Sequence, residues 1–128
     1  MILLDSCVVI EYTRGKDVKL QVLFGTLPLA VCGIARAEVL AGSRSAADRG
    51  KLLAILDNVV QVSIPEPVWD AVGDNLAALR AGGVTVPFPD VVLATVAIGN
   101  GMEFWTRDGQ FGHVQRILPA LKLFHEPP

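Results

Sequence analysis

The sequence "FPDVVLATVAIGNG", from Phe88 to Gly101, places one acidic residue, Asp90, at the head of a stretch that is otherwise uncharged and mostly apolar. A carboxylate beside a hydrophobic interior loses hydration, so it persists only where another group compensates. A helix cap would be one compensation, and a cation shared with other carboxylates would be another. The stretch predicts a buried helix from residue 90 to about residue 99, and the role of Asp90 depends on the rest of the chain.

The composition favours one globular domain over residues 1–128. Hydrophobic residues make up 52% of the chain and the mean hydropathy is +0.47, which indicates buried strands and some apolar partner surface. The uncharged run 91–102 is too short to cross a bilayer, and no basic leader precedes "MILLD", so we expect a cytoplasmic protein without a membrane segment. The net charge of -2 means that any nucleic-acid binding must be local.

Short apolar runs alternate with segments of helical period along the whole chain. The predicted strands are residues 2–4, 27–33, 59–64, 103–106 and 121–124. The predicted helices are residues 8–12, 17–24, 34–40, 45–60, 67–82, 90–99 and 111–118. Such alternation predicts an α/β domain with a mainly parallel central sheet and helices on both faces.

Four carboxylates are expected at one edge of this sheet, because parallel strands all point their carboxyl ends to the edge where ligands bind. Asp5 follows the first strand and Asp108 follows the fourth. Glu38 lies in the helix that leaves the second strand, and Asp90 heads the helix before the fourth. Carboxylates that converge without nearby lysines repel one another unless protons or a divalent cation intervene. Ligation by oxygen alone suits Mg²⁺ or Mn²⁺, so the pattern predicts a hydrolytic metal site.

Four blocks of the sequence, in order, resemble those of PIN-domain proteins and together cover nearly the whole chain. The blocks are "ILLDSCVVIEY", "GIARAEVLAG", "FPDVVLATVAIGNG" and "FWTRDGQF". Each block alone is a weak signal, whereas the ordered set is fairly specific. The compact length is similar to that of VapC-type toxins of toxin-antitoxin pairs. The resemblance implies a PIN-like three-layer fold and a metal-dependent endoribonuclease that a cognate VapB-type antitoxin keeps inactive.

The resemblance also assigns roles to particular positions. The family's acidic quartet matches Asp5, Glu38, Asp90 and Asp108, and its polar auxiliaries match Ser6 and Thr106. Many relatives carry a further Asp or His where this sequence has Gln110, which puts a second fully ligated metal in doubt. The two arginines that border the quartet and could contact phosphates are Arg36 and Arg107.

These roles lead to a specific mechanism. We expect Mg²⁺, or Mn²⁺ in its place, on Asp5 and Asp90 with Asp108 as a third ligand, where it would activate water and polarise a phosphate of RNA. Glu38 would ligate through water or orient the nucleophile. The resemblance further implies a homodimer and an antitoxin tail over residues 8–23. From the residues alone, the apolar side chains of that segment could equally be core.

Other interpretations remain open at this stage. A phospho-receiver-like signalling domain would need paired acids after the first strand, where Asp5 stands alone, and only Lys122 favours it. A catalytically inactive PIN-like binding module is disfavoured by the intact quartet, and a DNA nuclease of this family usually carries additional helices. Cys7 and Cys32 are expected to be small buried hydrophobes rather than a disulfide pair. Nothing in the sequence identifies the RNA or its cleavage site.

Overall fold

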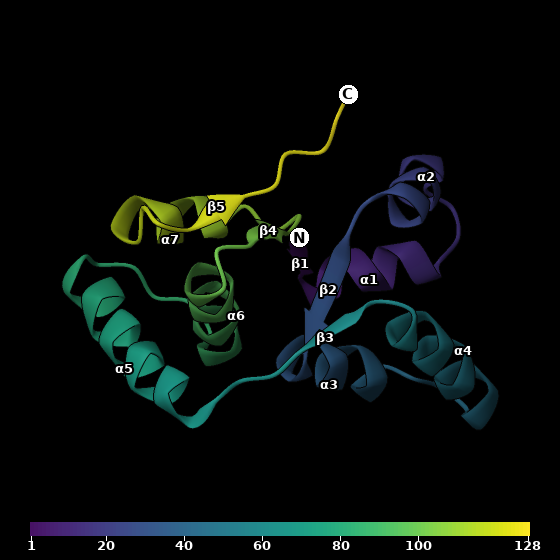
Figure 1. Cartoon of the computed structure of the whole chain (residues 1–128), viewed down its shortest axis with the longest axis horizontal. Helices are drawn as coiled ribbons and strands as arrows, with labels where there is room; N and C mark the ends of the chain where they lie inside the picture. Colours follow the sequence, from purple (N-terminus) through teal and green to yellow (C-terminus); the bar gives the residue numbers. More distant parts are fainter.

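The computed structural model describes residues 1–128, and one five-stranded sheet forms its centre (Figure 1). The strands are β1 (Ile2–Leu4), β2 (Leu29–Cys32), β3 (Val60–Val62), β4 (Glu103–Trp105) and β5 (Lys122–Leu123). They lie in the order β3-β2-β1-β4-β5, and every neighbouring pair is parallel. The sheet predicted as mainly parallel is therefore entirely parallel.

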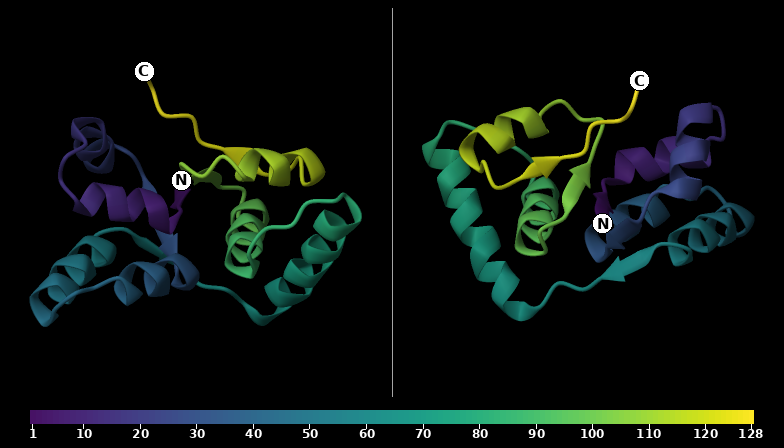
Figure 2. Two further views of the ribbon diagram at one scale, coloured as in Figure 1. Left: turned by 180° about the vertical axis from the view of Figure 1, so that it is seen from behind. Right: turned by 45° about the horizontal axis from the view of Figure 1, so that its top comes forward.

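Seven helices surround the sheet. They are α1 (Ser6–Thr13), α2 (Val18–Thr26), α3 (Gly33–Ala41), α4 (Ala46–Asp57), α5 (Glu66–Ala81), α6 (Phe88–Gly99) and α7 (Phe111–Ile117). Helices α1 and α2 lie on one side of the sheet, α6 lies on the other, and α5 packs outside α6 (Figures 1 and 2). This arrangement confirms the predicted three-layer α/β fold. No helix combines the length and the apolarity that a membrane crossing requires.

Several helices differ from the sequence prediction by one to three residues at their ends, and two of these differences have a clear physical cause. Helix α6 begins at Phe88 rather than at Asp90, because Pro87 occupies the N-cap position and its ring fixes a φ that suits the start of a helix. Asp90 therefore lies in the first turn and is not the cap. Helix α2 continues through Gly25 to Thr26, since one glycine in the last turn weakens a helix only modestly.

Helix α6 is buried without interruption from Val91 to Ala97. Its one polar side chain in that run, Thr95, donates a hydrogen bond to the Val91 carbonyl at 2.7 Å and accepts one from Asn75 of α5 at 2.9 Å. A helix enclosed between a sheet and another helix has no solvated face, so it is apolar all round. This position explains the uncharged sequence that follows Asp90.

The strand order places a topological switch point between β1 and β4. The chain moves outward from β1 through β2 to β3 and then crosses to the opposite side of β1 to form β4. In open parallel sheets, a crevice forms at the carboxyl ends of the strands where the order reverses in this way. Asp5 emerges from β1 at that crevice, and its backbone N–H donates to the carbonyl of Trp105 at the end of β4 at 2.9 Å. Glu103 pairs with Ile2 at the opposite edge.

Candidate functional site

Asp5 is the most enclosed carboxylate of the site, with 5% of its surface exposed. Its Oδ1 accepts a hydrogen bond from the backbone N–H of Ser6 at 2.8 Å, and its Oδ2 accepts one from the Thr106 hydroxyl at 2.8 Å. The Cys7 thiol donates a longer bond to Oδ2 at 3.5 Å. A buried carboxylate needs such donors to offset its lost hydration. Asp5 is therefore held in one orientation at the head of α1.

Asp108 lies in the connection between β4 and α7, and the same Thr106 fixes it. The backbone N–H of Asp108 donates to the Thr106 hydroxyl at 2.9 Å, while Asp108 Oδ1 accepts from the backbone N–H of Gln110 at 2.9 Å. Thr106 thus joins Asp5 to Asp108 through one hydroxyl, which agrees with the auxiliary position predicted for it. Gln110 supports Asp108 through its backbone, and its side-chain amide makes no hydrogen bond.

Asp90 is the carboxylate whose charge is least compensated. Neither of its side-chain oxygens accepts a hydrogen bond, and burial raises its pKa from the ordinary 3.8 to about 6. The negative charges of Asp5, Asp108 and Glu38, in that order, add to the increase in pKa. Asp90 therefore does not cap the helix, and its carboxylate lies close enough to Asp5, Asp108 and Glu38 for their charges to act on it.

Glu38 completes the group from α3. Loss of water contact raises the pKa of its carboxyl group, the charge of Asp5 raises it further, and the Ser6 hydroxyl opposes the change. Ser6 therefore interacts with two members of the quartet, through its backbone with Asp5 and through its side chain with Glu38. The four acids that the sequence predicted for one edge of the sheet influence one another electrostatically in the structure.

Arg107, predicted to contact phosphates, is bound to two carboxylates instead. Its Nε and one terminal nitrogen donate to Glu126 at 2.8 and 2.9 Å, and the same terminal nitrogen donates to Asp17 at 2.9 Å. Trp105 Nε1 also donates to Glu126, at 3.0 Å. These contacts raise the pKa of Arg107, so its charge is permanent but largely neutralised. A phosphate contact by Arg107 would have to compete with both carboxylates.

Arg36, the other arginine predicted to border the quartet, pairs with the end of a neighbouring helix. Its guanidinium donates to Asp57, the last residue of α4, at 2.8 Å and to Gln61 of β3 at 3.2 Å. The sequence places Asp57 before β3, toward the edge of the sheet that lies opposite the quartet. Its guanidinium is thus already bound to Asp57 and Gln61, and its predicted phosphate contact stays a prediction.

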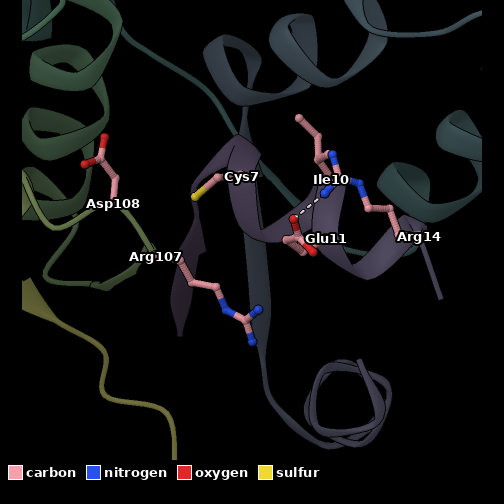
Figure 3. A pocket seen from close by; sticks show the side chains of 6 residues that line it. All are labelled: Cys7, Ile10, Glu11, Arg14, Arg107 and Asp108. Carbon is pink, nitrogen blue, oxygen red and sulfur yellow. Dashed lines mark hydrogen bonds and ion pairs between the residues drawn. The ribbon is translucent and has the colours of Figure 1, made fainter. Parts of the chain in front are cut away.

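A cavity of about 510 Å³ opens beside Asp108, between α1 and the β4–α7 connection (Figure 3). It is lined by Cys7, Ile10, Glu11, Arg14, Arg107 and Asp108. The sequence predicts Cys7 only as a small buried hydrophobe, whereas the structure places its thiol beside Asp5 and in the lining of this cavity. Burial raises the pKa of this thiol, so it is a neutral donor to Asp5. Its position two residues after Asp5 was the only available signal, and that spacing has no specific meaning in a sequence.

A model of the PIN domain family matches residues 2–117 of the sequence, which is most of the chain. The chain belongs to the PIN domain family. Among the curated proteins, none matches the sequence. The family match confirms the resemblance that the four sequence blocks carried.

Solved structures of toxin–antitoxin proteins share the fold of this PIN domain at low sequence identity. VapBC-1 from nontypeable Haemophilus influenzae gives a TM-score of 0.81 at 16% identity, with 97% of each chain covered. DNA-bound VapBC from Salmonella typhimurium gives 0.80 at 17% identity, with 96% of each chain covered. VapC20 of Mycobacterium tuberculosis, a toxin that cleaves the sarcin-ricin loop, gives 0.71 at 15% identity and covers 88% of this chain and 93% of its own.

The donor chemistry of this PIN domain fits a hard divalent cation. All four converging groups are carboxylates, and Asp90 has both oxygens free of hydrogen bonds. However, no group of three or more His, Cys, Asp or Glu side chains is arranged to hold a metal ion directly. Direct ligation by Asp5, Asp90 and Asp108 together is therefore not preformed. Mg²⁺ commonly binds through one or two carboxylates and waters, and this arrangement suits that mode.

Proposed function

We propose that this PIN domain is a Mg²⁺- or Mn²⁺-dependent endoribonuclease that hydrolyses phosphodiester bonds of cellular RNA. The observation that carries the proposal is the convergence of four carboxylates at the switch point, where the pKa of Asp90 rises to about 6. A divalent cation bound there would lower the pKa of a water molecule and offset the charge of the phosphate. Membership of the PIN family and the shared fold of VapC20, which cleaves RNA, support the proposal.

The hydrogen bonds of each carboxylate suggest which role it would have in the reaction. Asp5 has fixed oxygens, because Ser6 and Thr106 bind both of them, so it would provide a rigid anchor for the cation. Asp90 would provide the second contact through its unbonded oxygens. Asp108 has one oxygen free of its bond to Gln110 and would assist them. The raised pKa of Glu38 suits a group that accepts a proton from water or orients it.

The same proposal includes the biological setting of a toxin. We propose that a VapB-type antitoxin binds this chain and that the chain forms a homodimer in the cytoplasm. In the segment where the sequence placed the antitoxin tail, the side chains of Val8, Val9, Leu20 and Leu23 are core. Val18 and Val22 of α2 are 77% and 58% exposed, so they supply apolar surface for a partner. The structures from Haemophilus and Salmonella are of VapBC complexes, which supports this setting.

Cleavage of RNA by the purified chain tests the proposal. We expect cleavage of total RNA with Mg²⁺, no cleavage in excess EDTA, and recovery when Mg²⁺ or Mn²⁺ is restored. Asp5→Asn should abolish cleavage and keep the fold, because the amide has nearly the same volume and Thr106 can turn its hydroxyl to match it. Asp74→Asn, an exposed charge change within α5, should retain full activity.

Three results would contradict the proposal. Cleavage that persists in EDTA would exclude the metal, and full activity of Asp5→Asn with an unchanged circular dichroism spectrum would exclude the carboxylate site. A loss of activity in Asp74→Asn equal to that in Asp5→Asn would show that total charge, rather than this crevice, controls cleavage.

A further inference from the structure

A second hollow, of about 350 Å³, lies between the α5–α6 connection and α7. It is lined by Gly83, Val84, Thr85, Val86, Gln110, His113 and Arg116. Its four polar side chains are Thr85, Gln110, His113 and Arg116, and none of them makes a hydrogen bond or ion pair within the chain. The hollow therefore presents a set of unengaged donors and one permanent positive charge, with no carboxylate in its lining.

The two segments that line this hollow are continuous in sequence with segments that carry acids of the proposed active site. One wall ends at Val86, and the chain then enters α6, whose first turn carries Asp90. The other wall begins at Gln110, whose backbone N–H holds the carboxylate of Asp108. The hollow consequently lies between the segments that carry two of the four acids. A strand of RNA whose scissile phosphate met those acids could extend into it.

Charge balance favours a cationic side chain beside the four acids. Four carboxylates repel a polyanion, so positive side chains beside them would add binding energy to what a bound divalent cation supplies. Three arginines already form ion pairs with carboxylates, so their charges are less available to RNA. They are Arg14, Arg36 and Arg107. Arg116 lines the hollow, forms no ion pair, and lies in the last turn of α7. Arg80, in the last turn of α5, also forms no ion pair, but it does not line this hollow. Arg116 is therefore the one arginine of the lining, and its charge is available.

We infer that this hollow is a subsite for a phosphate of the RNA strand next to the one that is cleaved, and that Arg116 is its principal contact. The guanidinium provides a charge-assisted bond to the phosphate, and Thr85 and Gln110 provide neutral hydrogen bonds. The contact is to the backbone, so it positions the strand without selecting its sequence. This inference rests on the proposed RNA substrate and names a contact for it that the acidic quartet cannot supply.

Binding of a short fluorescent single-stranded RNA tests the subsite. We would use Asp5→Asn as the background in Mg²⁺, so that the RNA stays intact, and measure fluorescence anisotropy between about 50 and 200 mM salt. Adding Arg116→Gln should weaken binding about fivefold or more and lower the slope of log K against log salt by about 0.7, the value for one phosphate contact. Arg116→Lys should keep the slope, because it keeps the charge.

Arg49→Gln is the matched control, because Arg49 lies exposed on α4 without an ion pair and carries the same charge. It should change the affinity less than about twofold. Equal losses in Arg49→Gln and Arg116→Gln would overturn the subsite, as would unchanged binding in a folded Arg116→Gln protein. In the otherwise unsubstituted enzyme, Arg116→Gln should raise KM while kcat stays within about twofold.

The outcomes for the subsite and for the proposed function can be separated. Cleavage by the wild-type chain with no effect of Arg116→Gln would reject the subsite and keep the nuclease. Loss of RNA binding in Arg116→Gln without any cleavage by the wild-type chain would keep the subsite and reject the nuclease.

Discussion

At the scale of single residues, Asp90 shows how a fold can make a carboxyl group easy to protonate. Its pKa rises to about 6 because it loses water and faces Asp5, Asp108 and Glu38, whereas no donor stabilises its charged form. Asp5 is more deeply buried, yet it accepts hydrogen bonds from Ser6 and Thr106. The two carboxylates therefore differ in partners more than in burial, and Asp90 is the one that a cation would stabilise most.

Asp90→Asn should stabilise the protein in EDTA at about pH 7 by roughly 1 kcal/mol, discounted from the full pKa shift because Asp90 is only partly buried. Its folded pKa of about 6 exceeds the ordinary 3.8, so the folded state retains a proton that the unfolded state releases. The stability of the wild type should thus fall as pH rises from about 4 to 6, and the advantage of the variant should vanish near pH 4. Urea unfolding at several pH values measures this, and equal stability of both proteins at pH 7 would contradict it.

At the scale of elements, the connection from β4 to α7 holds two acids together. The Thr106 hydroxyl donates to Asp5 after β1 and accepts from the backbone of Asp108, so one side chain couples the ends of two adjacent strands. The Gln110 backbone then fixes the carboxylate of Asp108 before α7 begins. The geometry of the site is therefore set by a short connection whose own hydrogen bonds leave it little freedom.

Thr106→Val should cost about 1 to 3 kcal/mol of stability, because it conserves volume but removes the strongest donor to Oδ2 of the buried Asp5 carboxylate, which then keeps only the long contact from Cys7. It should also lower the cleavage rate, since Asp5 and Asp108 lose their common support. Thr106→Ser retains the hydroxyl and should recover most of both. Chemical denaturation and RNA cleavage measure the two effects, and a stable, fully active Thr106→Val protein would show that this hydroxyl is dispensable.

At the scale of the whole molecule, one cluster ties the last residues of the chain to the site. Glu126 accepts hydrogen bonds from Arg107 and Trp105, and Asp17 before α2 accepts another from Arg107. Lys19 lies 3.8 Å from Glu126 and adds a weaker attraction. Three segments that are remote in sequence thus meet at the residue next to Asp108. The C-terminal segment therefore helps to hold in place the residue that precedes Asp108.

Glu126→Gln should destabilise the protein by about 1 kcal/mol at neutral pH, a modest value because the ion pair is partly exposed to solvent. Hydrogen bonding from Arg107 lowers the pKa of Glu126 below its ordinary 4.5, so the stabilisation is present above that pH and is lost as pH falls below it. Thermal unfolding of wild type and variant should therefore converge in acid. Glu103→Gln, an exposed glutamate without a hydrogen bond, should change little. Equal effects of the two substitutions would show that the cluster contributes nothing specific.

The sequence alone determined the succession of strands and helices along the chain. It also determined the edge of the sheet to which the four acids belong. Both follow from local information: hydrophobic period identifies each element, and parallel strands must end at one edge wherever an acid follows them. The family blocks added the identity of the fold. The start of α6 was misplaced by two residues, because the preference of proline for a helix start outweighed the acidic signal of Asp90.

Only the tertiary structure decided what each charged group faces. Arg107 meets Glu126 and Asp17 across 19 and 90 residues, and the Thr106 hydroxyl meets Asp5 across 101 residues. No periodicity in the sequence encodes such pairs, because they depend on how side chains are oriented after the layers pack. The same is true of the pKa of Asp90, which depends on distances to charges from three other segments. The sequence therefore indicates which residues belong to the candidate site. The packing of the layers determines which groups they contact and how readily they are protonated.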